Sequence, residues 1–139
     1  MTLSEQRTRL IDDLRLIEDP HERLAAVVDR GRALPPLSAE ERVPANRVPG
    51  CLSELYLVGE FSQGVCRYRI DSGSAMIKGL AGLYCELYDR RPPEEITADP
   101  VDLVSAIGLD RMITPNRLAG IRKVSAAMDA FADRHLSPH

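Results

Sequence analysis

The 139-residue chain has no tryptophan, and aromatic residues make up only 4% of it. This scarcity argues against a surface on which nucleic-acid bases stack. Positive charge is not in excess either, because 18 Lys and Arg face 21 Asp and Glu, for a formal net charge of -3. Nucleic-acid binders usually present a basic face to the phosphate backbone. The sequence therefore predicts no nucleic-acid partner.

Long apolar stretches are also missing. No run approaches the roughly 20 apolar residues that span a bilayer, and the charged residues 1–19 do not read as a signal peptide. Three cysteines are too few, and odd in number, for a secreted domain held by disulfides. We expect a reduced, cytoplasmic protein with no membrane partner.

Common cofactor and metal motifs do not occur. The sequence has no glycine-rich phosphate loop, no CxxC and no HExxH pattern. Its histidines are His21, His135 and His139, which are scattered in a way that is typical of solvated side chains and not of a metal site. We therefore expect no metal and no cofactor bound by this chain itself.

The remaining composition, 44% hydrophobic and 28% charged, is that of a globular domain. We predict one domain over residues 1–139, with N-terminal helices over 3–31, a connector over 32–50, a sheet over 51–71 and further helices over 74–134. Segregation of helices and strands in this way favours an α+β fold, in which helices cover one face of a small antiparallel sheet.

Helix boundaries follow from capping residues and prolines. An acidic or hydroxyl residue before a proline marks a helix start, and three such pairs precede predicted helices: Asp19-Pro20, Asp99-Pro100 and Thr114-Pro115. Gly31 is placed to end the helix that starts at Pro20. Residues 74–89 form a nearly all-apolar, central helix, in which Gly79 and Gly82 are expected where the helix lies close to the sheet.

Strands are predicted at 52–58 and 65–70, where apolar and polar residues alternate in the second segment. Residues 59–64 are expected to form the turn between them, giving an antiparallel hairpin. A hairpin alone is marginally stable in water, so further cover is required. Residues 43–48 are a candidate for a short third strand.

The three cysteines differ in position. Cys66 falls on the apolar face of a strand and Cys85 in the middle of the apolar helix, and both are expected in the core because free cysteine behaves as a small hydrophobe. Cys51 follows Pro49-Gly50 at the end of the long connector. Reactive thiols need access and a positioned loop. Position alone leaves a reactive and a structural Cys51 equally open.

Arg117 is a second candidate. It falls in the first turn of the helix that begins at Thr114-Pro115, where a cation faces the positive end of the helix dipole. A carboxylate that holds Arg117 in place would explain it, and so would an anion or a partner surface. The sequence leaves these interpretations open.

Several motifs, taken in order, resemble the SufE family of sulfur-acceptor proteins over about residues 34–131. They are RVPGCLSELYL, MIKGLAGLYCELYDRRPPEEI and IGLDRMITPNRLAGI. The resemblance implies an α+β fold shared with IscU-type iron–sulfur scaffolds. It also implies a PLP-dependent cysteine desulfurase (SufS- or CsdA-like) as partner, with the PLP belonging to that enzyme.

The family pattern assigns roles to particular residues. Cys51 matches the cysteine that accepts sulfur as a persulfide, stimulates the desulfurase and passes the sulfur to an iron–sulfur scaffold or another acceptor. Gly50, Ser53, Lys78 and Arg117 match positions expected to support the loop or dock the partner. On this interpretation the chain is a sulfur-transfer protein and not an enzyme in its own right.

Three other functions remain as alternatives. An iron–sulfur scaffold on the same fold needs several converging thiolates, and Cys66 and Cys85 are poorly placed to join Cys51. A thiol-based redox enzyme usually has a resolving cysteine or a histidine near the attacking one. A non-transferring adaptor would bind the desulfurase without receiving sulfur, and Cys51 would then be dispensable for stimulation.

Overall fold

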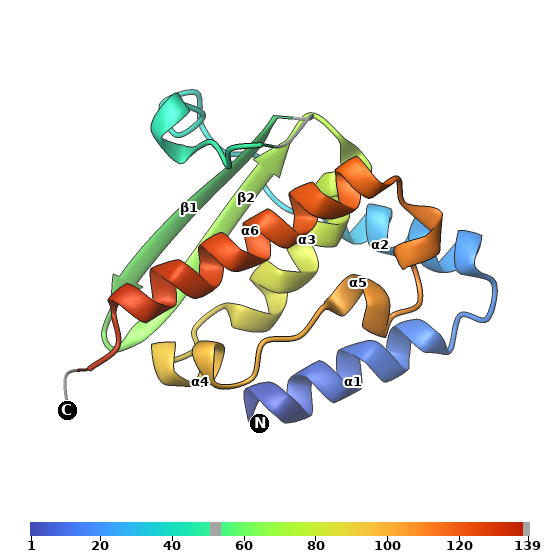
Figure 1. Cartoon of the computed structure of the whole chain (residues 1–139), viewed down its shortest axis with the longest axis horizontal. Helices are drawn as coiled ribbons and strands as arrows, with labels where there is room; N and C mark the ends of the chain where they lie inside the picture. Colours follow the sequence, from blue (N-terminus) through green and yellow to red (C-terminus); the bar gives the residue numbers. More distant parts are fainter. Residues whose placement is uncertain (51–53, 138–139) are drawn as a thin grey trace.

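A computed structural model describes residues 1–50 and 54–137. The elements follow one another from the N-terminus to the C-terminus as shown in Figure 1. They are α1 (Leu3–Arg15), α2 (Pro20–Arg32), the 3₁₀ helix η1 (Pro44–Asn46), β1 (Leu55–Ser62), β2 (Val65–Ser72), α3 (Ala75–Tyr88), α4 (Pro93–Ala98), α5 (Leu103–Ala106), the 3₁₀ helix η2 (Asp110–Met112) and α6 (Pro115–Arg134).

The helix starts agree with the capping signals at two of the three proline pairs. α2 begins at Pro20, with the Asp19 side chain accepting a hydrogen bond from the backbone N–H of His21, and α6 begins at Pro115. The prediction at Asp99-Pro100 is wrong. α5 begins only at Leu103, because Asp102 caps it by accepting from the Ser105 N–H.

The two strands form an antiparallel hairpin in which Leu55 pairs with Ser72 and Ser62 with Val65. β1 runs further than predicted, and the turn shrinks to Gln63 and Gly64. Their φ angles of 54° and 80° suit a tight turn that matches the strand twist. The third strand is not formed, since residues 43–48 contribute only an isolated bridge between Arg47 and Tyr56.

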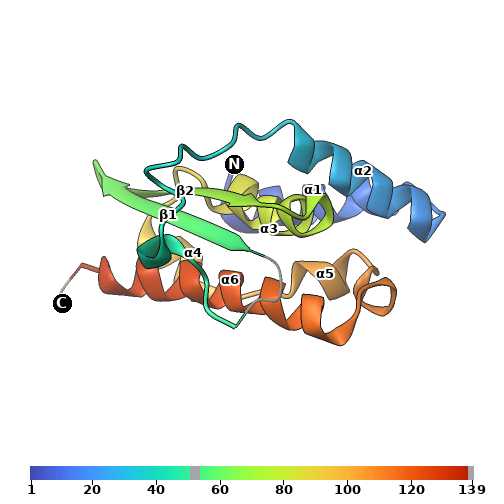
Figure 2. The ribbon, with the colours of Figure 1, turned by 90° about the horizontal axis from the view of Figure 1, so that it is seen from above.

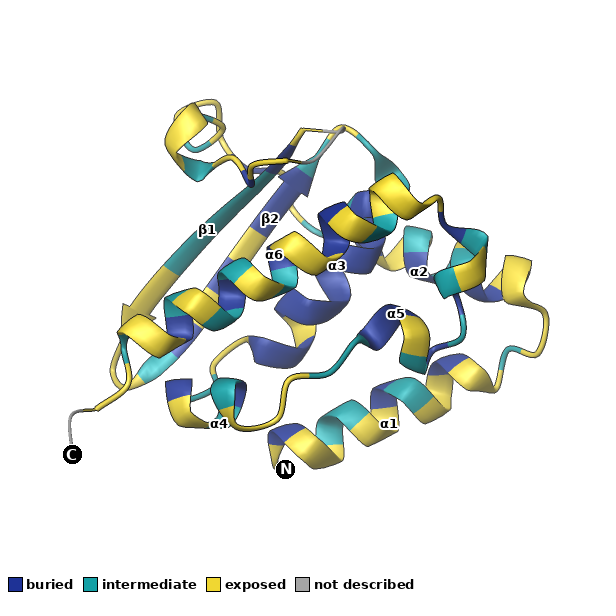
Figure 3. Cartoon of the chain, viewed as in Figure 1, coloured by how far each residue is buried: buried dark blue, intermediate teal, exposed yellow. Residues whose placement is uncertain are grey.

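Helices α3 and α6 cover one face of the hairpin, so the predicted α+β architecture is confirmed. Tyr68 on β2 shows the packing: its ring lies 5.6 Å from the Phe131 ring of α6, and its hydroxyl donates to the Met128 carbonyl at 2.7 Å. Seen from above, α6 runs along one side and the connector after α2 along the other (Figure 2). α3 is buried along most of its length, whereas α6 keeps an exposed outer side (Figure 3).

Two glycines set the closest helix crossing, and this corrects two predictions. Gly31 does not end α2 but lies inside it, and a Cβ there would come within 2.6 Å of the Gly79 backbone in α3. Gly79 in turn approaches the Val27 carbonyl of α2 and not the sheet, and Gly82 faces the Leu34 side chain. The missing side chains let α2 and α3 pack backbone to backbone.

We expect Gly79→Ala to destabilise the protein by up to about 2 kcal/mol. Alanine is the better helix former by roughly 1 kcal/mol, but its Cβ would lie 2.6 Å from the Val27 carbonyl oxygen, and overpacking costs about 1–3 kcal/mol. Urea unfolding measures the balance. Gly73→Ala is the matched control, because nothing lies within 4 Å of a Cβ at Gly73. Equal stability of the two variants would contradict the close crossing.

Within residues 1–50 and 54–137, no helix combines the length and the apolar character that crossing a membrane requires.

Candidate functional site

The two described thiols are built into the core. Cys66 is fully buried and Cys85 is 6% exposed, as the sequence predicts. Burial raises the pKa of Cys66 and, more strongly, that of Cys85, because a thiolate would lose its hydration there. At neutral pH both are protonated and are therefore poor nucleophiles. Cys51 and Ser53, the other predicted residues of this region, lie outside the described residues.

The segment that carries Cys51 starts and ends at a single point of the hairpin. The Val48 N–H donates to the Leu55 carbonyl at 2.8 Å, and Arg47 bridges to Tyr56. The chain therefore returns at Leu55 to the point that it leaves at Val48, and we call the intervening stretch of sequence, residues 49–54, the loop. Val48 and Leu55 are both buried, so the base of this loop is fixed in the core.

Gly50 enters this loop with a φ of 79°, which is the left-handed region that suits glycine. The Lys123 ammonium of α6 donates to the Gly50 carbonyl at 3.2 Å. The positive charge of Lys123 therefore lies at Gly50, the residue that precedes Cys51 in the sequence. Sequence reasoning did not identify Lys123, because 73 residues separate it from Gly50.

Arg117 lies exposed in the first turn of α6. No carboxylate of a described residue forms an ion pair with it, so the interpretation that a described carboxylate holds Arg117 in place is wrong. Arg117 and Lys123 are on the same helix, six residues apart. With a rise of 1.5 Å per residue, the two positions are about 9 Å apart along the α6 axis.

Lys78 lies on α3 and contacts the connector. Its ammonium lies 3.3 Å from Asp71 Oδ1 and donates to the Leu34 carbonyl at 3.1 Å. Asp71 Oδ2 accepts from the Leu37 N–H at 3.0 Å. The pair therefore fastens residues 34–37 to the end of β2. No hydrogen bond joins Lys78 to Gly50 or Arg117 within the described part of the chain, and Asp71 is a second residue that the sequence analysis missed.

A groove of about 410 Å³ begins beside the loop, and we call it the α6 groove. It runs between the connector, β1 and α6. Its lining residues are Ala45, Asn46, Arg47, Val48, Pro49, Leu57, Gly59, Ala127, Ala130, Phe131 and Arg134.

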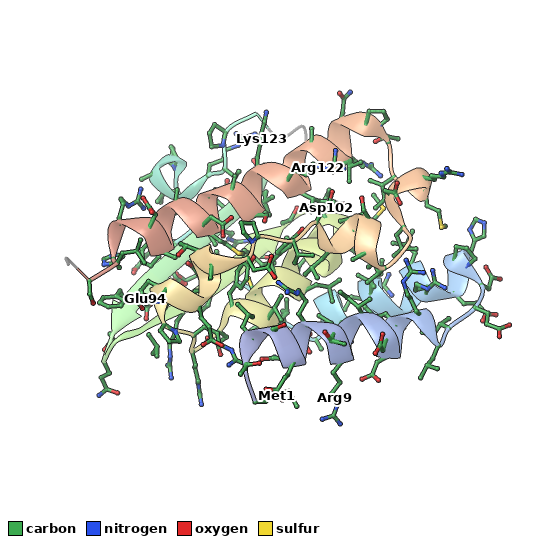
Figure 4. All side chains as sticks on the ribbon, turned by 60° about the horizontal axis from the view of Figure 1, so that its bottom comes forward. Met1, Arg9, Glu94, Asp102, Arg122 and Lys123 are labelled. Carbon is green, nitrogen blue, oxygen red and sulfur yellow. The ribbon has the colours of Figure 1, made fainter. Side chains whose placement is uncertain are left out.

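Side chains on α6 separate two environments. Figure 4 shows Lys123 on the side of α6 that faces the connector, whereas Arg122 lies on the side toward α5 and Asp102. Arg122 donates to Asp102 Oδ2 at 2.9 Å, so its positive charge is paired with a carboxylate of the same chain. The connector side of α6 is thus the one that borders the loop and the α6 groove.

Metal-ligating side chains do not gather among residues 1–50 and 54–137, where no group of three or more His, Cys, Asp or Glu could hold an ion. The described thiols lie in the core and not on an open surface. Within these residues the arrangement offers a backbone pairing that brackets Cys51 in the sequence, the Lys123 ammonium at Gly50 and an open groove.

Comparison with known proteins gives a consistent family match. The family described as "SufE: Fe-S metabolism associated domain" matches residues 8–132. An uncharacterized SufE-like protein of Rhizobium etli is 32% identical over 121 residues, covering 84% of this chain and 82% of that protein. An uncharacterized SufE-like protein of Synechocystis is 28% identical over 131 residues, covering 94% of this chain and 82% of that protein.

A solved structure supports the same fold. The solution structure of a hypothetical protein from Thermus thermophilus superposes with a TM-score of 0.76 at 19% identity, covering 92% of this chain and 93% of that one. At this identity the likeness concerns the architecture alone.

Proposed function

Because this chain belongs to the SufE family, whose domain is associated with Fe–S metabolism, we propose that Cys51 accepts sulfur from a PLP-dependent cysteine desulfurase. The acceptor holds the sulfur as a persulfide, thereby stimulates the desulfurase, and delivers the sulfur for iron–sulfur cluster assembly. The chain acts as a sulfur carrier and activator, and the desulfurase performs the breakage of the carbon–sulfur bond with its own PLP.

The transfer is a thiol exchange. The Cys51 thiolate attacks the terminal sulfur of the persulfide on the desulfurase cysteine. A new S–S bond forms at Cys51 Sγ, the S–S bond in the donor breaks, and the donor cysteine leaves as a thiolate. The proton of the terminal sulfur stays with it. The donor Sγ takes the electron pair of the broken S–S bond and the Cys51 Sγ supplies the pair of the new one. The two proteins together undergo no net oxidation or reduction, so the step requires no further reactant.

The contrast among the three thiols carries the proposal. Cys66 and Cys85 are buried, and burial raises the pKa of each. Cys51 instead belongs to the loop that is closed by Val48 and Leu55. A carrier needs one accessible nucleophile, and this loop is the position in the chain that best fits that need.

Charge at the loop supports the same role. The Lys123 ammonium lies at the Gly50 carbonyl, and Arg117 is exposed on the same helix. A nearby cation favours the thiolate over the thiol and so favours attack on a persulfide. In this proposal Gly50 and Ser53 shape the loop, and Lys78 supports it indirectly by holding the connector that leads to it.

We expect Cys51→Ser to abolish sulfur uptake. The protein is incubated with a cysteine desulfurase, PLP and cysteine, and intact and peptide mass spectrometry then locate the added sulfur. The expected result is one added sulfur on the Cys51 peptide of the natural protein and none on the variant. Cys66→Ala is the matched control, because it removes a thiol that the proposal leaves unused.

Two results would contradict the proposal. If sulfur were added to Cys66 or Cys85 instead of Cys51, one of those thiols would be the acceptor and the proposal would be wrong. Full stimulation of the desulfurase by Cys51→Ser, with no sulfur on the natural protein, would show a non-transferring adaptor.

A further inference from the structure

We propose that the α6 groove binds an extended, acidic segment of the sulfur-donating protein, which adds as a strand to the free edge of β1. The proposal rests on the function proposed for Cys51, since it names the way in which that donor docks. Three features of the described residues support it: an unpaired strand edge, two cations at the groove, and a helix face that leaves room for a chain.

β1 has backbone groups that no neighbour uses. One edge of β1 pairs with β2. Among the described residues the other edge pairs only at its start, where the Leu55 carbonyl accepts from Val48 and Tyr56 bridges to Arg47. Outward groups recur at every second residue of an antiparallel strand, so Gly59 and Phe61 also direct their N–H and C=O groups to this edge. No backbone group of a described residue outside the hairpin is hydrogen-bonded to Gly59 or Phe61. An unpaired edge of this kind is a template for an added strand.

The charged side chains that line the groove indicate which kind of partner segment would bind there. Arg47 and Arg134 are exposed and line it, and neither forms an ion pair with a described residue. The Arg134 guanidinium lies 5.7 Å from the centre of the Phe131 ring. No described lining residue is acidic, although the chain as a whole carries a net charge of -3. Two guanidinium groups beside an apolar floor fit a segment that has both carboxylates and apolar side chains.

One face of α6 leaves space for this segment. Lys123, Ala127, Ala130 and Arg134 follow one another at intervals of four, three and four residues, which places them along one stripe of the helix. The two alanines and Arg134 line the groove, and Lys123 lies one turn of the helix before Ala127. Lys123 marks the end near Gly50. A chain seated along the stripe therefore reaches the loop that carries Cys51.

A second copy of this chain fits the groove less well. In a two-fold pairing of β1 with β1, each copy presents the same residues to the other. The residues of β1 that face α6 include Leu57, Gly59 and Phe61, which carry no charge. Such a pairing would leave Arg47 and Arg134 without carboxylates, and it would bring the guanidinium groups of both copies to one interface.

The first test reverses the charge of the groove. The full chain is titrated into the desulfurase of the sulfur-transfer experiment, and both the half-saturating concentration and the saturated rate of sulfur uptake at Cys51 are measured. We expect Arg47→Glu and Arg134→Glu each to raise the half-saturating concentration about tenfold or more, with little change in the saturated rate. Arg9→Glu is the matched control, because Arg9 lies on α1 at the opposite edge of the molecule (Figure 4).

The second test examines the strand edge itself. Phe61→Pro removes the aromatic ring and the outward N–H of residue 61, and proline is tolerated at a strand edge where that N–H has no partner in the sheet. Phe61→Ala removes the same ring but keeps the N–H. We expect weaker binding for Phe61→Pro than for Phe61→Ala at equal thermal stability. Hydrogen exchange of the Gly59 and Phe61 amides should slow when the desulfurase is bound, whereas the Val58 and Glu60 amides, which face β2, should change little.

The outcomes separate the two proposals. If sulfur reaches Cys51 but the groove variants behave like Arg9→Glu, or if exchange at Gly59 and Phe61 is unchanged, the groove proposal is wrong and the carrier function stands. If Cys51 gains no sulfur but Arg134→Glu still weakens binding of the desulfurase, the groove proposal stands and the carrier function fails. A dimer of the natural protein that Phe61→Pro dissociates would overturn the groove proposal in favour of a second copy.

Discussion

Replacing Arg23 with methionine should lower the free energy of unfolding by at least about 3 kcal/mol. Arg23 is a 7% exposed residue of α2 with no carboxylate partner among the described residues. Its guanidinium donates instead to backbone carbonyls: Leu14 at 3.1 Å, Ile17 at 2.6 Å and Ile107 at 3.0 Å. A hydrogen bond that involves a charged group contributes roughly 1.5–3 kcal/mol. The Ile17 and Ile107 carbonyls would lose their donor, whereas the Leu14 carbonyl would keep the Ile17 N–H.

Matched variants make this prediction specific to the carbonyls. Arg32→Met removes an arginine from the same helix whose side chain is 68% exposed, and its effect should stay within about 0.5 kcal/mol. Arg23→Lys keeps the charge but not the planar set of donors, so its stability should fall between the two. Urea unfolding at pH 7 gives all three values. A loss in Arg23→Met no greater than that in Arg32→Met would show that the carbonyls find other donors.

The second large effect is expected at Asp71, where Asp71→Asn should cost about 3 kcal/mol at pH 7. Asp71 and Lys78 form an ion pair with side chains 9% and 13% exposed. The substitution leaves the Lys78 ammonium buried without its counter-charge, and breaking one side of such a pair is strongly destabilising. It also weakens the bond that holds the Leu37 N–H. The connector should then become more susceptible to limited proteolysis at pH 7.

The loss of stability in Asp71→Asn should change with pH in one direction. Burial acts to raise the pKa of Asp71, but hydrogen bonds from the Leu37 N–H, the Lys78 ammonium and the Ser72 N–H outweigh it and hold the pKa below its ordinary value of 3.8. A carboxyl whose pKa is lowered by folding stabilises the protein above its unfolded pKa, and this contribution is lost as the pH falls through the folded pKa. The difference in stability between the natural protein and Asp71→Asn should therefore be full at pH 7 and shrink below about pH 4.

A double-mutant cycle tests whether the two residues act as a pair. Lys78→Met alone leaves the carboxylate buried, whereas Asp71→Asn with Lys78→Met removes both charges. We expect the double variant to be more stable than the sum of the single losses predicts. Strict additivity would mean that the two charges contribute independently.

The sequence predicts most of what is local in this fold. The starts of α2 and α6 follow from Asp19-Pro20 and Thr114-Pro115, because a proline suits the first turn of each helix. The Asp19 side chain also caps α2, whereas the Thr114 side chain makes no capping hydrogen bond. The start of α5 was missed although the signal was of the same kind. Asp102 competes with Asp99 for the capping role, and only the fold shows that Arg122 of α6 holds Asp102 in position.

Features that join distant segments were not predictable in the same way. Gly31 looks like a helix end in isolation, yet it is needed inside α2 because Gly79 of α3 packs against it. At the candidate site, Gly50 and Arg117 were identified from local chemistry and from the family pattern. Lys123 and Asp71 were not identified, because each one contacts a segment that lies more than 30 residues away in the sequence.

If Cys51 carries sulfur as proposed, the pairing of Val48 with Leu55 limits how far that sulfur can travel on this protein. Three residue steps separate Val48 from Cys51, and that length of extended chain spans at most about 10 Å. The covalent chain therefore keeps Cys51 within this short distance of Val48. A donor and a recipient that both reach it must occupy the same end of the hairpin, so they compete for the carrier instead of binding it together. On the proposed function, delivery then requires the loaded protein to dissociate and diffuse, and its turnover depends on how quickly the donor releases it.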